Sequence, residues 1–123
     1  MAKILITGGA GFIGSALAYR LKKNHEVHLL DREDNFKKKP FLGVFPEHYA
    51  DVRQHLLLDQ EFDFIFHLAA QASVPISIDH FYASSKNNLN STLRVWDIAK
   101  NIDVPIVYAS SSAVYGNLPY GND

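Results

Sequence analysis

Four glycines within the seven residues from Gly8 to Gly14 constrain this chain more than any other feature of its sequence. They directly follow Lys3–Thr7, an aliphatic and β-branched run that predicts a strand buried on both faces. Because glycine adopts backbone conformations that are closed to other residues, the spacing predicts a tight turn from this strand into a helix. Backbone N–H groups at the positive end of a helix form a site for phosphate.

The residues after the glycines complete a strand-helix-strand unit. Apolar residues at three- and four-residue steps from Phe12 to Lys23 predict an amphipathic helix. Val27–Leu30 is the predicted second strand, and Asp31 ends it at the spacing where dinucleotide-binding units place an acid against a ribose. A dinucleotide site is therefore predicted, with a glycine turn that binds nothing as the alternative. The apolar face of the helix would consist of Phe12, Ile13, Ala16, Leu17 and Leu21.

Three more strands and a long helix are expected further along the chain. Residues 32–46 are charged and contain Pro and Gly, which predicts an exposed loop. The lysines at 37–39 in this loop are expected to be solvated, and a phosphate contact is the alternative. Strands that alternate with helices along the chain predict an α/β fold with a doubly wound parallel sheet of about five strands and Lys3–Thr7 at its centre. The remaining expected elements are strands at Glu47–Ala50, Phe62–Leu68 and Val104–Ala109, a brief helix at Leu56–Leu58 and a helix from about Phe81 to Lys100.

The composition excludes several classes of function. A length of 123 residues with 47% hydrophobic residues predicts one packed domain. The net charge of -1 provides no global attraction to nucleic acid or to an anionic membrane. Because the chain has no cysteine, it has no disulfide, thiolate nucleophile or cysteine-ligated metal, and no metal site is expected. No segment approaches membrane-spanning length, so a soluble cytoplasmic protein is predicted.

Asp31 and Arg32 decide which dinucleotide is expected. The carboxylate of Asp31 can accept hydrogen bonds from ribose hydroxyls, and its charge would repel a 2′-phosphate, which favours NAD. Arg32 could neutralise such a phosphate, so NADP is the alternative. Asp31 could also be an ordinary loop acid.

Several short motifs together resemble one family. The chain is similar, over nearly its whole length, to the extended short-chain dehydrogenase/reductases, in particular to their NAD-dependent nucleotide-sugar epimerases and dehydratases. The resemblance implies a Rossmann-like fold of which this chain is the N-terminal, NAD-binding portion, with the C-terminal part of the fold and the substrate domain missing. The motifs are Thr7-Gly8-x-x-Gly11-x-x-Gly14, Asp51-Val52, His67-Leu68-Ala69-Ala70-Gln71-Ala72, the segment from Asn88 to Leu93, and Ser110-Ser111-x-x-Val114-Tyr115-Gly116.

The resemblance also implies roles for these residues. His67 is expected to be a hydrogen-bonded structural histidine and not a catalytic base, and Ser91 stands where the family has a glycine. Asn88 would lie near the cofactor or hold the active-site end of the sheet. The cofactor would be contacted by Gly8, Gly11, Phe12, Ile13 and Gly14 at the pyrophosphate, Asp31 and Arg32 at the ribose, Asp51 and Val52 at the adenine, and Leu68, Ala69 and Ala70 along the wall.

Ser111 is the predicted catalytic residue, and Ser111 and Ser112 would contact the sugar. The family's Tyr-x-x-x-Lys pair is absent downstream of Ser111, since Pro119 stands four residues after Tyr115. The prediction is the NAD-binding portion of a nucleotide-sugar epimerase that acts by transient hydride transfer at a sugar carbon. A 4,6-dehydratase, a reductase or a non-catalytic dinucleotide-binding fragment are the alternatives. The parent protein would be a homodimer that binds a nucleotide sugar.

Overall fold

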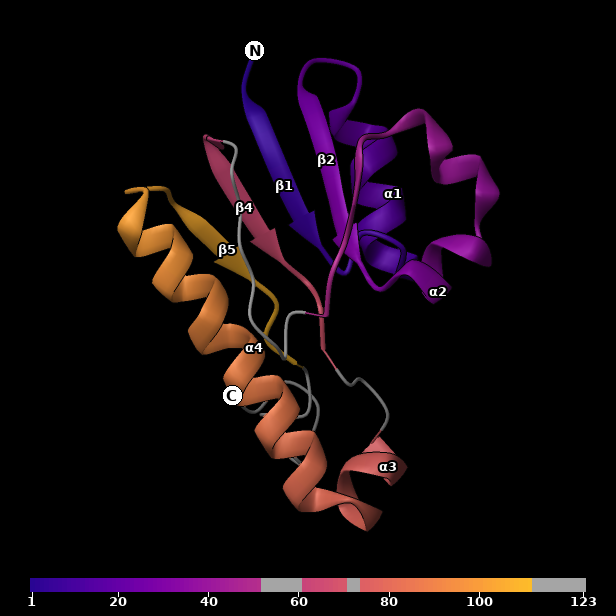
Figure 1. The fold of residues 1–123 in the computed structure, drawn as a ribbon, viewed down its shortest axis with the longest axis vertical. Coiled ribbons are helices and arrows are strands. Elements are labelled where there is room, and N and C mark those ends of the chain that lie inside the picture. The colour runs from indigo at the N-terminus through magenta and orange to yellow at the C-terminus, as the bar shows by residue number, and fades with distance from the viewer. Residues whose placement is uncertain (52–60, 71–73, 112–123) are drawn as a thin grey trace, which may run out of the picture.

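The computed structural model describes residues 1–51, 61–70 and 74–111 of the chain. Its described strands form one parallel sheet in the order β3-β2-β1-β4-β5, with β1 at the centre as predicted (Figure 1). Each predicted strand is present, with bounds that differ by at most two residues. The strands are β1 (Lys3–Thr7), β2 (Glu26–Asp31), β3 (Glu47–Tyr49), β4 (Phe64–His67) and β5 (Ile106–Tyr108).

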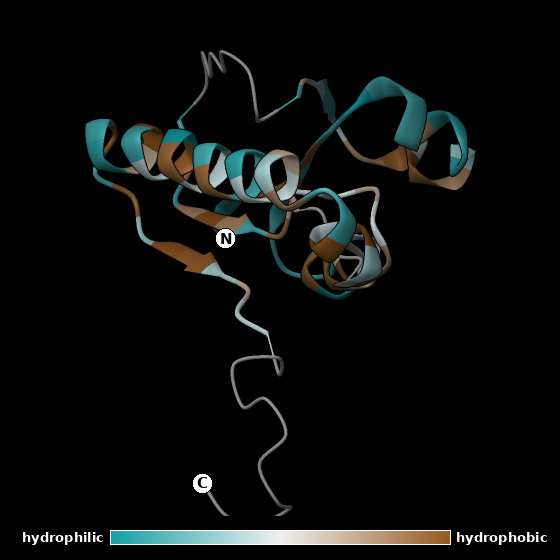
Figure 2. Cartoon of the chain, turned by 90° about the horizontal axis from the view of Figure 1, so that it is seen from below, coloured by the Kyte–Doolittle hydropathy of each residue, from teal (hydrophilic) through white to brown (hydrophobic). Residues whose placement is uncertain are grey.

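Helices cover both faces of this sheet, which confirms the doubly wound α/β fold. Along the chain, α1 (Phe12–Leu21) joins β1 to β2, and α4 (Phe81–Asn101) precedes β5. Figure 2 shows α4 crossing one face of the sheet, with brown apolar segments alternating with teal polar ones. A short helix, α3 (Val74–Asp79), precedes α4 and has no counterpart among the predicted elements.

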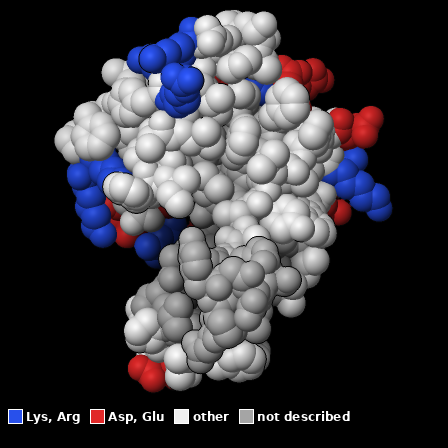
Figure 3. All heavy atoms as spheres, turned by 180° about the vertical axis from the view of Figure 1, so that it is seen from behind, with Lys and Arg blue, Asp and Glu red and all other residues white. Residues whose placement is uncertain are grey.

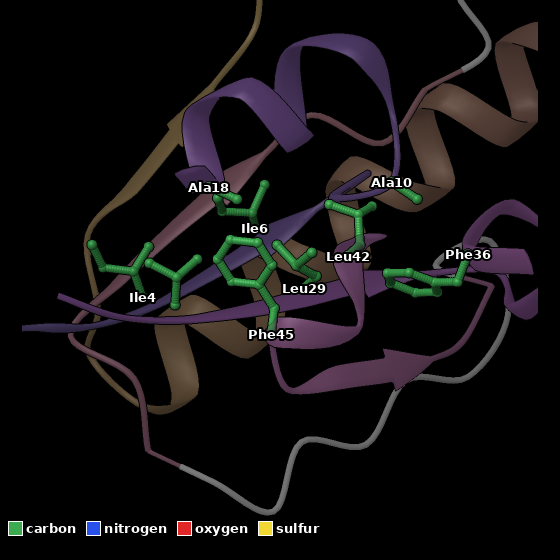
Figure 4. Close-up of a cluster of buried hydrophobic side chains, with 9 residues drawn as sticks. Ile4, Ile6, Ala10, Ala18, Leu29, Phe36, Leu42 and Phe45 are labelled. Carbon is green, nitrogen blue, oxygen red and sulfur yellow. The ribbon is translucent and has the colours of Figure 1, made fainter. Parts of the chain in front are cut away.

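Two clusters of buried side chains form the core, one on each face of the sheet. Successive residues of β1 alternate between them, because side chains of a strand point to opposite faces. Ile4 and Ile6 pack on the side of α1 (Figure 4). Leu5 packs on the side of α4. The first cluster consists of Ile4, Ile6, Ala10, Ala18, Val27, Leu29, Phe36, Leu42 and Phe45, and the second of Leu5, Leu30, Phe62, Ile65, Val95 and Ala99.

The prediction of an exposed loop over residues 32–46 is wrong. The segment contains α2 (Glu33–Lys37) and a 3-10 helix (Pro40–Val44), and it contributes three side chains to the first core cluster. The charged residues that suggested a loop lie on the outer side of these short helices, while Phe36, Leu42 and Phe45 are buried. Their irregular spacing matches neither a strand nor a long helix, so no periodic pattern indicated their burial.

The predicted apolar face of α1 is also wrong for three of its five residues. Phe12 is 89% exposed and Ile13 is 66% exposed, and Ala16 is exposed as well. The helix instead buries Gly14, Ser15 and Ala18, the small residues that allow it to lie close against the sheet. Leu17 and Leu21 pack at the edge of the core as predicted.

The remaining expectations concern the surface and the undescribed residues. Figure 3 shows one face of the molecule on which charged side chains lie at the margins and neither sign forms a single patch. No helix among the described residues is long and apolar enough to cross a membrane. The brief helix predicted at Leu56–Leu58 falls outside the described residues.

Candidate functional site

A cavity of about 440 Å³ opens at the carboxyl ends of β1, β2, β3 and β4. Its volume lies in the range of about 300–1,000 Å³ that is usual for ligand pockets. The chain runs from β1 outward to β3 and then crosses back to β4 on the other side of β1, so the cavity lies at the reversal of strand order. Open parallel sheets bind ligands at such a point.

The glycine turn forms one wall of this cavity and closely contacts the turn after β4. Gly8 has a φ of +70°, in the left-handed region that favours glycine. A Cβ on Gly8 would lie 2.7 Å from the backbone nitrogen of Ala69, so no side chain fits between the two turns. Gly8 N donates to Leu30 O at 2.8 Å, and Gly11 N donates to Gly8 O at 3.0 Å. These contacts fix the turn before any ligand enters.

The N-terminus of α1 faces this turn without a side-chain cap. Gly11 is its N-cap residue and provides no capping hydrogen bond, and the first turn contains no acidic residue. The first N–H groups of a helix need partners from outside the helix, and they carry a partial positive charge. A phosphate next to the glycine turn would satisfy both requirements.

Asp31 holds the far side of the glycine turn. Its Oδ2 atom accepts a hydrogen bond from Ala10 N at 3.1 Å, and its Oδ1 atom accepts from Arg32 N at 2.8 Å and from Asn35 Nδ2 at 2.7 Å. The half-buried carboxylate is thereby fixed in the cavity lining at the end of β2. It lies where an acid that binds a ribose is expected.

Cations outnumber acids in the lining. Arg32, Lys38 and Lys39 line the cavity together with Asp31 and Asp51. Arg32 Nε also lies 3.7 Å from Asp34 Oδ1, in an exposed ion pair. Lys37 and Lys38 are exposed and Lys39 is half-buried, and whether Lys38 or Lys39 contacts a phosphate stays a prediction. An excess of positive charge suits an anionic ligand.

Beneath the cavity, His67 links β1, β4 and α4. The ring is buried, and its Nδ1 atom lies 2.7 Å from Thr7 Oγ1 while its Nε2 atom lies 3.2 Å from Thr92 Oγ1. Burial lowers the pKa of His67 below its ordinary value, because a charged ring would lose its hydration. Hydrogen bonds at both nitrogens agree with the expectation of a structural histidine.

The structure brings most of the predicted cofactor residues together. Phe12, Ile13 and Gly14 lie in the first turn of α1 and are not part of the lining, so their contact with a pyrophosphate stays a prediction. Ser111 is exposed beyond the end of β5 and is also outside the lining. Val52 and Ser112 lie outside the described residues. The predicted residues that line the cavity are Gly8, Gly11, Asp31, Arg32, Asp51, Leu68, Ala69, Ala70 and Asn88.

Several lining residues were not predicted from the sequence. Asn35 belongs to α2, in the segment that was interpreted as a loop, and its four-residue spacing from Asp31 could have suggested their hydrogen bond. Ser91 is buried. It stands where the family has a glycine, which suggests that there is little room for a side chain at this position. The other unpredicted lining residues are Ala10, Leu30, Lys38, Lys39, Ala50 and Asn87.

Comparison with known proteins finds relatives along nearly the whole chain and solved structures with the same fold. An uncharacterized protein of Methanocaldococcus jannaschii is 35% identical over 143 residues, and UDP-glucuronic acid decarboxylase 1 of Danio rerio is 34% identical over 119 residues. They cover 98% and 94% of this chain. The crystal structure of UDP-glucose 4-epimerase from Bifidobacterium longum, in complex with NAD+ and UDP, covers 93% of the chain with a TM-score of 0.75 and 28% identity.

The chain spans less than half the length of each of these proteins, namely 44%, 28% and 38%. Its residues 4–122 match the family model described as the NAD dependent epimerase/dehydratase family. That match includes all five strands except the first residue of β1, and it includes every residue that lines the cavity. The chain therefore belongs to the NAD dependent epimerase/dehydratase family.

Proposed function

We propose that this chain is the NAD-binding portion of a nucleotide-sugar epimerase. The observation that carries the proposal is the close contact between the glycine turn and the turn after β4, where a Cβ on Gly8 would lie 2.7 Å from Ala69 N. This contact leaves a wall of backbone that a pyrophosphate can approach closely. Asp31 and the cations of the lining complete a cavity that suits a dinucleotide.

The residues of the cavity fit the separate parts of NAD. The glycine turn and the uncapped N-terminus of α1 would bind the pyrophosphate, and Asp31 would accept hydrogen bonds from the adenosine ribose. Asp51 would contact the adenine, as the family resemblance implies. Bound NAD would supply a hydride acceptor and donor at the cavity.

The proposed reaction is the inversion of one hydroxyl-bearing carbon of the sugar. That carbon loses a hydride while its hydroxyl loses a proton, and both are returned with the hydride on the opposite face, so no net oxidation occurs. Ser111, at the carboxyl side of β5, is the residue that we expect to hydrogen-bond the reacting hydroxyl. Ser112 is proposed to contact the sugar beside it.

Calorimetry with NAD+ and NADP+ tests the cofactor proposal. We expect NAD+ to bind more tightly, because the charge of Asp31 disfavours a 2′-phosphate. Asp31→Asn removes the charge and keeps one side-chain oxygen, which can accept from either Ala10 N or Arg32 N but not from both. The ratio of the two affinities should therefore narrow by about tenfold for a lost repulsion of about 1.4 kcal/mol. Asp97→Asn is the matched control, since Asp97 is exposed on α4 and lies outside the lining. Equal affinity of the unaltered protein for both dinucleotides would contradict the NAD preference.

Proton NMR of the full-length protein with UDP-sugars tests the reaction. An epimerase converts one UDP-hexose into its epimer without loss of mass, whereas loss of water indicates a dehydratase and loss of carbon dioxide indicates a decarboxylase. We expect epimerisation, slowed about a hundredfold by Ser111→Ala, the scale for removing one hydrogen-bond donor from a reacting oxygen. Ser110→Ala is the neighbouring control. Turnover of every tested sugar to a product of different mass would refute the epimerase proposal.

Two further proposals concern the whole protein. We propose that it is a homodimer, which sedimentation of the full-length protein tests. We also propose that it acts in the cytoplasm, which fractionation of the source cells tests.

A further inference from the structure

The hydroxyl of Thr7 joins the two turns that form the cavity wall. Thr7 is the last residue of β1, directly before Gly8, and its side chain is fully buried. Its Oγ1 atom accepts hydrogen bonds from Leu68 N at 3.2 Å and from Ala69 N at 3.3 Å. Leu68 N also donates to Thr7 O at 3.1 Å within the sheet, so Ala69 N depends more strongly on the hydroxyl.

The neighbouring hydrogen bonds determine which nitrogen of His67 carries a proton. Thr92 Oγ1 donates its only proton to Asn88 O, at 2.9 Å, and can therefore only accept from His67 Nε2. His67 Nε2 must carry the proton, and in a neutral ring the Nδ1 atom is then an acceptor. Thr7 consequently donates its hydroxyl proton to Nδ1.

This arrangement uses every hydrogen-bonding position of the Thr7 hydroxyl. A threonine hydroxyl has one proton and two lone pairs. The proton is directed at His67, which leaves both lone pairs for the N–H groups of Leu68 and Ala69. A protonated His67 would present a donor at Nδ1 instead, so three donors would compete for two lone pairs.

We propose that His67, in its neutral Nε2–H form, is a positioning residue that orients the Thr7 hydroxyl and thereby holds the cavity wall against the glycine turn. Protonation of the ring reverses the hydrogen bond to Thr7, releases Ala69 N, and weakens dinucleotide binding at low pH. The inference rests on the proposed binding of NAD in this cavity. His67 itself is not part of the lining and acts through Thr7.

The surroundings of His67 support a neutral ring. The polar side chains that face it are Thr7 from β1 and Thr92 from α4, and Tyr108 is its register partner on β5. Among the described residues, no carboxylate or cation counteracts the burial that lowers the pKa of His67. The ring therefore stays neutral at pH values where an exposed histidine is already charged.

Nitrogen-15 NMR of the histidine rings in the full-length protein tests the assignment without any ligand. We expect His67 to show the Nε2–H form at pH 7.5 and to stay neutral below the ordinary histidine value of about 6.5. Its signals are identified by their loss in His67→Asn. A dominant Nδ1–H form, or a ring charged at pH 6.5, would overturn the inference whatever NAD does.

Calorimetry with NAD+ at pH 7.5 and at a lower pH where the NMR titration shows the His67 ring to be protonated tests the consequence for binding. The unaltered protein should bind at least fivefold more weakly at the lower pH, the factor for one hydrogen bond of ordinary strength. His67→Asn keeps an oxygen acceptor for Thr7 but cannot titrate, so its affinity should be equal at the two pH values. Thr92→Val removes the acceptor of Nε2–H and should mix the two neutral ring forms, whereas Thr92→Ser should restore Nε2–H.

The outcomes separate this inference from the proposed function. If the unaltered protein binds NAD+ equally at both pH values, or if His67→Asn shows the same loss of affinity at the lower pH, the inference fails and the proposed function stands. If NAD+ does not bind at any pH, the proposed function fails and the inference fails with it. Thermal melts of each variant at both pH values show whether it is folded under the conditions of the titration.

Discussion

Replacing Gly14 by alanine sets helix propensity against packing. Gly14 is buried in the first turn of α1, and an added Cβ would lie 2.3 Å from Gly8 O and 3.0 Å from Gly9 Cα. Ordinary contact begins at 3.4 Å, so the first distance is 1.1 Å too short (3.4 − 2.3). Both sides of the clash are backbone, and no flexible side chain can move away. The helix and the glycine turn must therefore separate.

The expected change in the free energy of unfolding of Gly14→Ala follows from two opposing contributions. Alanine within a helix is favoured over glycine by about 1 kcal/mol. Overpacking of a close contact costs about 1–3 kcal/mol, and a backbone-to-backbone clash belongs at the upper end of that range. The free energy of unfolding should therefore fall by about 2 kcal/mol. For a domain of this size the unfolding midpoint should fall by about 6–10 °C.

Thermal unfolding followed by circular dichroism measures this change. Gly43→Ala is the matched control, because Gly43 is exposed in the 3-10 helix and an added Cβ would meet nothing within 4 Å. Its free energy of unfolding should stay within about 0.5 kcal/mol of the unaltered protein. If Gly14→Ala melts at the same temperature as the unaltered protein or higher, helix propensity decides the outcome and the packing argument is refuted.

Three other changes test the core, a helix end and an ion pair. Leu29→Ala, at a side chain that is 0% exposed, should lower the free energy of unfolding by about 2–5 kcal/mol in urea titrations. Leu89→Ala, at a side chain that is 60% exposed, is the control and should lower it by less than about 0.5 kcal/mol. Equal losses in the two variants would contradict the assigned core. Asp103, directly after α4, has a φ of 55°, in the left-handed region that favours glycine. Asp103→Gly should therefore raise the melting midpoint by an amount equivalent to about 0.5 kcal/mol of stability. A lower midpoint would show that this conformation carries no strain. The hydrogen bond from His28 lowers the pKa of Glu26, so the stability that this pair contributes is present above the ordinary glutamate pKa and is lost as the pH falls through the lowered value. NMR titration of His28→Phe should show a higher pKa for Glu26 than in the unaltered protein. An unchanged pKa would exclude the hydrogen bond as the cause.

The central position of β1 and the position of the glycine turn could be predicted because the local pattern and the tertiary environment agree there. β1 is apolar on both faces because it is central and parallel, and the glycines follow it directly. Asp31 could be placed because its position depends only on the length of one strand-helix-strand unit. These features need no knowledge of contacts distant in the sequence.

The buried face of α1 and the segment after β2 could not be predicted, because tertiary packing decides both. Phe12 and Ile13 are apolar but exposed, and the smaller Gly14 and Ala18 are buried because α1 lies close to the sheet. Lys39 reaches the cavity only because the segment from α2 to the 3-10 helix folds back over the core. Hydrophobic periodicity cannot distinguish a small buried residue from a small exposed one.

The two turns that form the cavity wall are far apart in the sequence, since Thr7 and His67 are separated by 60 residues. Closing a flexible loop of that length costs on the order of 4 kcal/mol of chain entropy. A ligand that is held by both turns, at a concentration a hundred times its dissociation constant, contributes about 2.7 kcal/mol to the stability of the folded chain. It therefore offsets much of that entropy cost. The dinucleotide would then act as a non-covalent cross-link between the two halves of the sheet, and a chain in which β4 had not yet paired with β1 would contain the whole glycine motif and bind nothing.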